Sequence, residues 1–250
     1  MERHLISRIA HTDHPIAAPL SDESVERLLD RATRGGAERM LDLGCGEAPW
    51  LLRALAARPK LRAVGVDLDA EALTLARRSA DALGVARRLG LHHQDAREFS
   101  SAEPFDVVLC VGATHAFGGL LPTLAAVREH LAPGGVAVVG DCFWEREPSR
   151  AALDELGGIA AEEYADLPTT VERVVAEGWT PVQGHVSSLQ EWDDYEWAWT
   201  GSLAEWALDN PGHPESEEAA TVAAEHRHGW LSGYRGTLGF VTLLLRRTAA

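Results

Sequence analysis

The sequence has no apolar run that approaches the roughly 20 residues of a membrane-spanning helix. Its first residues are polar and lack the apolar core of a signal peptide. Cysteine is scarce as well: Cys45, Cys110 and Cys142 cannot all pair, and their spacing does not match a metal site. These absences argue against a membrane protein and a disulfide-stapled secreted one, so we expect reduced thiols in a cytoplasmic protein.

Positive charge is the other deficit. The chain carries 23 Lys and Arg residues against 38 Asp and Glu residues, which gives a formal net charge of −15. Because the phosphates of DNA or RNA need a basic surface, this balance argues against a nucleic-acid partner and favours a small molecule. At 250 residues, with no internal repeat, the chain is long enough for one α/β domain with an appended subdomain. Its oligomeric state stays open between a monomer and a homodimer.

A glycine turn is the most informative local feature. Residues 40–50 read Met-Leu-Asp-Leu-Gly-Cys-Gly-Glu-Ala-Pro-Trp, which is an apolar strand, a tight turn and the start of a leucine-rich helix. A second apolar strand ends in Asp67. This pairing predicts a nucleoside-binding crevice at the carboxyl ends of parallel strands. Gly44 and Gly46 let the backbone approach a ligand closely, and Asp67 can accept both ribose hydroxyls.

The turn lacks what phosphate binding requires. Pro49 stands at the third glycine position of the dinucleotide fingerprint, and no Lys or Arg follows as in a P-loop. Proline fits the first turn of a helix, so the helix is still expected. Asp42, just before the turn, would repel a pyrophosphate and attract an ammonium or sulfonium. A cationic, phosphate-free nucleoside such as S-adenosylmethionine has the matching chemistry.

In these features the chain resembles the class I S-adenosylmethionine-dependent methyltransferases, in particular those that act on small molecules. Five motifs follow the family's order within residues 40–140. Ala48 departs from the family, because it stands where the third glycine of G-x-G-x-G is usual, and we expect its methyl group to narrow the pocket slightly. The motifs are residues 41–46, 65–69, 94–96, 105–110 and 131–139.

The resemblance implies an α/β fold: a Rossmann-like, seven-stranded, mostly parallel sheet with helices on both faces, an antiparallel edge strand and a helical lid insertion. It divides the chain into an N-terminal cap segment with a first helix (1–36), a cofactor-binding core (37–190 and 235–250) and the lid (191–234). In the fifth motif, Pro133 to Gly135 are expected to form a turn into a strand at residues 136–139.

The cofactor implied by the resemblance is S-adenosyl-L-methionine. Asp67 would bind its ribose, and Asp95, after the third strand, would reach the adenine amino group. The full set of expected cofactor contacts is Asp42, Gly44, Cys45, Gly46, Asp67, Leu68, Asp95, Ala96, Val111 and Gly112.

Periodicity and capping residues predict the elements outside the motifs. Ser21 is expected to cap a helix that ends near Gly35, with Leu20 and Val25 as a hydrophobic staple. Further helices are expected at residues 70–83, 120–131, 149–156 and 169–177, and strands at 179–188 and 237–246.

The predicted lid has an unusual composition. It holds five of the eight tryptophans, and residues 191–225 contain ten acidic side chains and no lysine or arginine. Two helices are expected, at 193–209 and 214–231. They form either an amphipathic subdomain with solvated carboxylates, or a lid whose aromatic and acidic inner face encloses the methyl acceptor. The second interpretation favours a cationic or amine-bearing acceptor, with Tyr195, Trp199 and Tyr234 as substrate-binding residues.

Three other positions carry candidate chemistry. His11 and His14 lie in a polar, proline-containing segment that is either a solvated turn or a wall of the cofactor cleft, with His11 binding substrate and His14 acting as a base. His115 follows the fourth strand between glycines. It is the strongest catalytic candidate, since a histidine can remove a proton from the acceptor, although a purely structural hydrogen bond would also account for it. Asp141, at the end of the fifth strand, is a further catalytic candidate, and Trp144 just after it is a substrate-binding one.

The sequence therefore predicts transfer of a methyl group to nitrogen or oxygen of a small molecule in specialised metabolism. Two alternatives remain: a non-methylating enzyme on the same fold, such as a decarboxylase or cyclase, and a cofactor-binding scaffold protein. We expect no metal site, because His92 and His93 adjoin on a strand and the i, i+2 pair His226 and His228 diverges on a helix.

Overall fold

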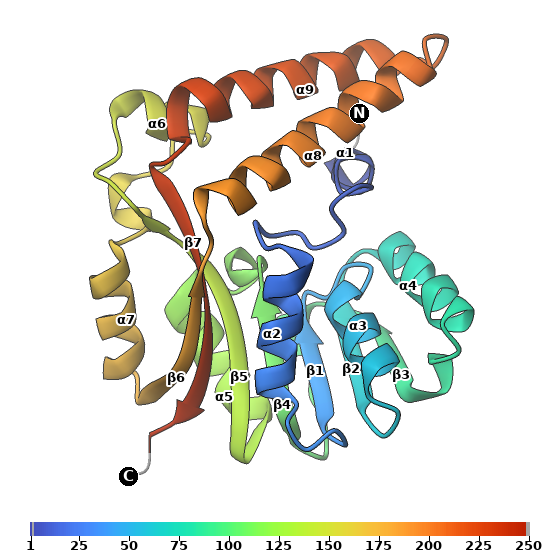
Figure 1. The fold of residues 1–250 in the computed structure, drawn as a ribbon, viewed down its shortest axis with the longest axis vertical. Coiled ribbons are helices and arrows are strands. Elements are labelled where there is room, and N and C mark those ends of the chain that lie inside the picture. The colour runs from blue at the N-terminus through green and yellow to red at the C-terminus, as the bar shows by residue number, and fades with distance from the viewer. Residues whose placement is uncertain (2, 249–250) are drawn as a thin grey trace. The chain divides into compact units, whose positions relative to one another are not determined.

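The computed structural model describes Met1 and residues 3–248, so Glu2 and the last two residues of the predicted 235–250 core segment lie outside the described residues. The predicted fold class is confirmed: seven strands form one sheet in the order β3-β2-β1-β4-β5-β7-β6. Strands β1 to β5 pair in parallel, and β7 runs in the opposite direction (Figure 1). The strands are β1 (Arg39–Leu43), β2 (Arg62–Asp67), β3 (Leu89–His93), β4 (Phe105–Val111), β5 (Leu131–Trp144), β6 (Trp179–Val186) and β7 (Leu238–Arg247).

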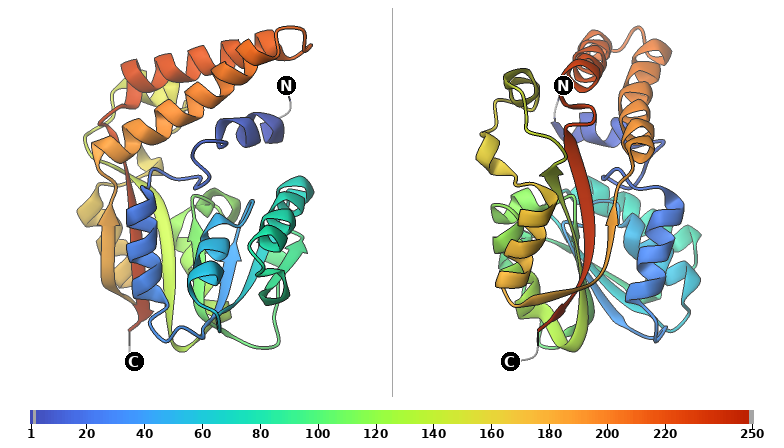
Figure 2. Two further views of the ribbon diagram at one scale, coloured as in Figure 1. Left: turned by 45° about the vertical axis from the view of Figure 1, so that its right-hand side comes forward. Right: turned by 60° about the vertical axis from the view of Figure 1, so that its left-hand side comes forward.

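Helices cover both faces of this sheet. Figure 2 shows α2, α3 and α4 on one face, and α5 and α7 on the other. The α-helices are α1 (Arg3–Ala10), α2 (Asp22–Ala32), α3 (Pro49–Ala57), α4 (Ala70–Ala82), α5 (Leu120–His130), α6 (Arg150–Glu155), α7 (Leu167–Ala176), α8 (Leu189–Asp209) and α9 (Ser216–Gly229). The short 3-10 helices are η1 (Ala86–Arg88), η2 (Ala96–Glu98), η3 (Thr114–Phe117) and η4 (Ala161–Glu163), and η5 (Trp230–Tyr234) is a π-helix.

Capping residues set several helix starts. The Ser21 side chain accepts a hydrogen bond from the Ser24 amide, which confirms the predicted N-cap of α2. Ser188 and Glu191 form a capping box, so α8 starts at Leu189, earlier than its apolar pattern predicts. None of the helices in the described ranges combines the length and hydrophobicity that crossing a bilayer requires.

Strand β5 is longer than predicted. Pairing advances five residues along β5, from Leu131 to Val136, while it advances two along β4, from Phe105 to Val107. The predicted turn at Gly134 is therefore a bulge inside the strand, where its φ of +79° needs glycine. The strand also runs on to Trp144, so Asp141 and Trp144, predicted at and beyond its end, both lie within it.

Close backbone contacts divide the chain into two compact units. We call residues 1–20, 142–170 and 186–240 the cap unit, and residues 21–141, 171–185 and 241–250 the core unit. The core unit contains the glycine turn and the carboxyl ends of β1 to β4. The cap unit contains α1, α8 and α9. The segment boundaries predicted from the sequence stay predictions.

The cap unit has a small apolar core of its own. Leu203, Ala207, Ala219 and Ala223 are buried between α8 and α9, which run antiparallel (Figure 1). Ile6 and Ile9 of α1 pack against the same cluster, and α1 is a helix that the sequence analysis did not predict. Burial of this apolar stripe explains why so short a helix is stable here.

Candidate active site

The glycine turn joins β1 to α3 through three residues with left-handed backbone. Gly44, Gly46 and Ala48 have φ values of +83°, +53° and +59°. A Cβ on Gly44 would lie 2.6 Å from the Cβ of Ala113, so only glycine fits there. Ala48 is fully buried and is the single non-glycine residue of the described chain with positive φ, at the position where the resemblance expects glycine.

Asp67, at the end of β2, connects this turn to the next one. Its two carboxylate oxygens accept hydrogen bonds from the Gly46 amide at 2.7 Å and from the Asp69 amide at 2.8 Å. A carboxylate offers about four acceptor positions, so it retains capacity for two further donors such as ribose hydroxyls. The side chain therefore shapes the turn and can bind a nucleoside at the same time.

Asp42 precedes the same turn, Cys45 is part of it, and both side chains are buried. Burial and the neighbouring Asp67 raise the pKa of Asp42 to about 7, so its carboxyl group titrates in the neutral range. A bound cation would favour its ionised form. Burial also raises the pKa of Cys45, whose sulfur fills the space beside Gly65, where a Cβ would lie 2.7 Å from Sγ. Cys45 is thus a packed thiol.

The next expected contacts follow the ends of β2 and β3. Asp95 caps η2 through the Arg97 amide, and hydrogen bonds from Arg97 lower the pKa of this carboxyl group. Ala96 is buried, whereas Leu68 is 62% exposed and its carbonyl oxygen lies 3.0 Å from His93 Nε2. Because β1, β2 and β3 are adjacent and parallel, these residues lie along one edge of the sheet, as the sequence analysis expected.

The loop after β4 carries His115. Gly112 and Gly118 on either side have φ values of +76° and +87°, and His115 is exposed on η3. The preceding Thr114 donates a hydrogen bond of 3.0 Å from Oγ1 to the buried carboxylate of Asp141. Asp141 therefore anchors the loop that presents His115, and Val111 and Gly112 form the start of that loop.

In the cap unit, His11 and Tyr195 form a defined pair. His11 Nδ1 lies 2.7 Å from the Ser7 carbonyl oxygen, which can only accept, so Nδ1 carries the proton. His11 Nε2 then accepts from the Tyr195 hydroxyl at 3.2 Å. Burial lowers the pKa of His11 and thereby favours this neutral form.

His14 is placed differently. Its Nδ1 donates to the Ile16 carbonyl oxygen at 2.8 Å, and its ring meets the Tyr195 ring edge-on at 5.3 Å. Nε2 has no hydrogen-bond partner in the described part of the chain, which makes it the better placed base of the two histidines. Trp144 is 7% exposed and its indole N–H donates to Ala161 at 2.8 Å, so its polar group is already satisfied.

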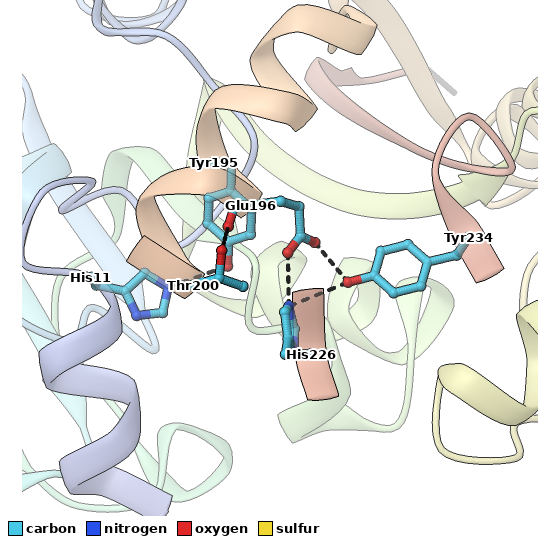
Figure 3. Close-up of polar contacts among 6 residues, drawn as sticks. All are labelled: His11, Tyr195, Glu196, Thr200, His226 and Tyr234. Carbon is cyan, nitrogen blue, oxygen red and sulfur yellow. Dashed lines mark hydrogen bonds and ion pairs between the residues drawn. The ribbon is translucent and has the colours of Figure 1, made fainter. Parts of the chain in front are cut away.

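Glu196, His226 and Tyr234 form a buried polar network (Figure 3). Glu196 Oε2 lies 2.7 Å from His226 Nε2, and Glu196 Oε1 accepts from the Tyr234 hydroxyl at 2.8 Å. Trp199 stacks on the His226 ring at 4.0 Å. Two expected substrate residues, Trp199 and Tyr234, are thus brought together through His226.

From the sequence, His226 is considered only as a metal ligand, and Glu196 is no more than a weaker acceptor-side candidate from the predicted lid. A signal for Glu196 was present, because it interrupts the buried stripe of α8 formed by Trp192, Thr200 and Leu203. A lone carboxylate at a core position of a helix needs a partner, and that requirement points to a polar network.

Comparison with known proteins agrees with this geometry. Residues 40–135 match a family model described as a methyltransferase domain. The chain is 28% identical over 221 residues to the uncharacterized protein YjhP of Escherichia coli (strain K12), and the match covers 88% of each chain.

Solved structures show the same similarity over almost the whole chain. A crystal structure of an S-adenosylmethionine-dependent methyltransferase from Geobacter sulfurreducens superposes with a TM-score of 0.89 at 26% identity, covering 97% of this chain and 98% of that one. Another from Thiobacillus denitrificans also gives 0.89, at 27% identity and 99% coverage of both chains. Both are complexes with S-adenosyl-L-homocysteine.

Proposed function

We propose that this chain, which belongs to the class I S-adenosylmethionine-dependent methyltransferases, transfers a methyl group to nitrogen or oxygen of a small molecule. It is a methyltransferase, and S-adenosyl-L-methionine is its methyl donor. The observation that carries the proposed site is the carboxylate of Asp67, bonded to the Gly46 and Asp69 amides and able to accept two more donors.

The residues of the core unit fit this cofactor. Asp67 is proposed to bind the ribose, Asp95 the adenine amino group, and Asp42 to supply negative charge for the methionine part. When bound, the cofactor supplies a methyl group made electrophilic by its sulfonium, so the protein's main contribution is alignment. Gly44 and Gly46 contribute by leaving the backbone uncovered by side chains.

A base is needed only when the acceptor arrives protonated. We assign this role to His115, with the Thr114 hydrogen bond to Asp141 holding its loop, and to His14 as the alternative. The proposed acceptor contacts are His11, Trp144, Tyr195, Trp199 and Tyr234. The last three of these residues are aromatic and have acidic neighbours, which supports an amine-bearing acceptor.

The setting of the enzyme follows from the same features. The three cysteines, all within the described residues, form no disulfide, which supports a cytoplasmic location. A dedicated small-molecule acceptor supports a role in specialised metabolism, and the acidic balance of the chain makes nucleic acid an unsuitable substrate.

Purified protein is expected to form S-adenosylhomocysteine from the donor only when an acceptor is supplied from a panel of small amines, phenols and alcohols. His115→Asn should lower kcat by about 10²–10⁴-fold for an acceptor that must lose a proton, with a smaller change in KM. His228→Asn, exposed on α9, is the control and should leave both constants unchanged.

Each other outcome of this assay has a meaning. An unchanged kcat in His115→Asn would assign the base role to His14. Donor consumption without S-adenosylhomocysteine would favour a decarboxylase or cyclase, and failure to bind either cofactor form in calorimetry would favour a scaffold.

Donor binding is expected to depend on pH through Asp42. A carboxyl group with a pKa of about 7 is mostly protonated at pH 6 and mostly ionised at pH 8. If its charge attracts the cationic donor, affinity for S-adenosylmethionine should rise about tenfold over that range, as measured by calorimetry. Neutral 5′-methylthioadenosine should show a much smaller change, and Asp42→Asn should flatten the donor profile. A donor affinity that stays constant in the native protein would remove this role from Asp42.

A further inference from the structure

The cap unit contains a pocket whose lining includes Tyr234, one of the proposed acceptor contacts. Its volume is about 420 Å³, which is within the range of small-molecule sites. The pocket lies where the C-terminal end of α9 and the π-helix η5 face α6. Its lining residues are Glu155, Leu156, Val222, Glu225, His226, Gly229 and Tyr234.

The lining is acidic. Glu155 and Glu225 contribute carboxylates from two different helices, and neither lysine nor arginine occurs among the lining residues, all of which the structure describes. A concave surface with charge of one sign attracts the opposite sign. The pocket therefore favours a positively charged ligand.

A third carboxylate is buried next to two of the lining residues. Glu196 is 2% exposed, and its oxygens are bonded to His226 and Tyr234, both of which line the pocket. Burial and the Glu196 carboxylate raise the pKa of Tyr234, so the phenol stays protonated and donates. Within the described residues His226 is the only ion-pair partner of Glu196, so neither lysine nor arginine competes with a bound cation for this carboxylate.

His226 is held in a fixed orientation. Its ring stacks on Trp199 at 4.0 Å with an interplanar angle of 23°, and its contacts with Glu196 and Tyr234 both use Nε2. Nδ1 has no hydrogen-bond partner in the described part of the chain. This nitrogen belongs to a residue of the pocket wall and is available to a ligand.

Close packing keeps the pocket in shape. A Cβ on Gly229 would lie 2.6 Å from Glu155 Oε2, and one on Gly233 would lie 2.8 Å from Glu155 Cγ. Glu155 therefore packs against two glycines at the end of α9 and in η5, which fixes the position of one of the two acidic walls.

We propose that this pocket is the amine-binding subsite of the enzyme, with Glu155 and Glu225 facing a protonated amino group and Glu196 acting through His226 and Tyr234 as a buried counter-charge. The proposal rests on the proposed function, because it names the class of acceptor. A metal ion is the poorer occupant, since no three His, Cys, Asp or Glu side chains of the described residues converge as metal ligands.

The test measures binding without the methyl donor. Benzylamine, phenethylamine and 1,4-diaminobutane are titrated at pH 7.5 against benzyl alcohol and 2-phenylethanol, with heat and tryptophan fluorescence as readouts, because Trp199 adjoins His226. At least one amine is expected to bind tenfold or more tightly than either alcohol. The proposal is overturned if no amine binds better than the alcohols.

Matched variants locate the site. Glu225→Gln and Glu196→Gln should each weaken amine binding by tenfold or more, whereas Glu205→Gln, which removes the same charge from an exposed position of α8, should have no effect. If circular dichroism shows that Glu196→Gln is unfolded, Glu225→Gln and Tyr234→Phe decide. Equal binding by native protein and all pocket variants would overturn the proposal.

The two proposals fail in different ways. Amine binding that depends on Glu225, combined with no S-adenosylhomocysteine from any acceptor, would contradict the proposed function and leave the pocket standing. Methyl transfer to a neutral acceptor with the same kcat and KM in Glu225→Gln would leave the function standing and overturn the pocket proposal.

Discussion

Replacing Asp67 with alanine is expected to weaken binding of S-adenosylmethionine by 100-fold or more in calorimetry. Hydrogen bonds to a charged carboxylate contribute about 1.5–3 kcal/mol each, and two ribose hydroxyls would lose their acceptor. The Gly46 and Asp69 amides would also lose their partner, so the free energy of unfolding should fall by about 1–3 kcal/mol. The loss of donor affinity should be larger than the loss that a destabilised turn alone would cause.

Asp69→Ala separates the two effects. Asp69 lies two residues further on and caps α4 by accepting from the Glu71 and Ala72 amides. Its removal should cost about 1 kcal/mol of stability while donor affinity changes little. If Asp67→Ala retained native affinity, or if both variants lost affinity equally, a ribose-binding role for Asp67 would be wrong.

The second large effect is expected at Gly44. Alanine there must adopt a φ of +83°, which costs about 1–2 kcal/mol, and its Cβ would lie 2.6 Å from that of Ala113. Relief of this overlap requires movement of the turn or of the loop before His115, at a further cost of about 1–3 kcal/mol. Gly44→Ala should therefore lower the midpoint of chemical unfolding strongly and abolish detectable donor binding.

Gly36 provides a matched control. Its φ is +73°, and no atom lies within 4 Å of the position of an added Cβ. Gly36→Ala should show only the conformational cost and full donor binding. In a double-mutant cycle, Ala113→Gly should recover the steric part of the loss in Gly44→Ala. Equal destabilisation at Gly36 and Gly44, with no recovery, would show that the contact with Ala113 is unimportant.

The sheet and the arrangement of its proposed cofactor-binding edge were largely predictable, because the residues concerned lie in short contiguous segments. A strand, a glycine turn and an acid at the next strand's end specify a crevice without knowledge of distant contacts. Asp42, Gly44, Asp67 and Asp95 lie at neighbouring strand ends for this reason. The bulge in β5 was missed, since Pro133 to Gly135 have the composition of an ordinary turn.

The cap unit was much less predictable. Its polar pairs join residues far apart in sequence: His11 and Tyr195 are 184 positions apart, and Glu196 and His226 are 30 apart. Helical periodicity gives the apolar face of each helix but not which faces meet or in what register. Helix α1 escaped prediction because its stability depends on packing against α8 and α9.

The π-helix η5 determines on which side of the helix axis the Tyr234 side chain lies. In a regular α-helix each residue turns by about 100°, so the eight residues from His226 to Tyr234 would leave the two side chains about 80° apart around the axis. A π turn accommodates one additional residue, which reduces the offset to that of seven residues, about 20° in the opposite sense. The Tyr234 side chain consequently lies on the same side of the helix as His226, so the carboxylate of Glu196 contacts both. One irregular helical turn is thus sufficient to bring both side chains to the same carboxylate.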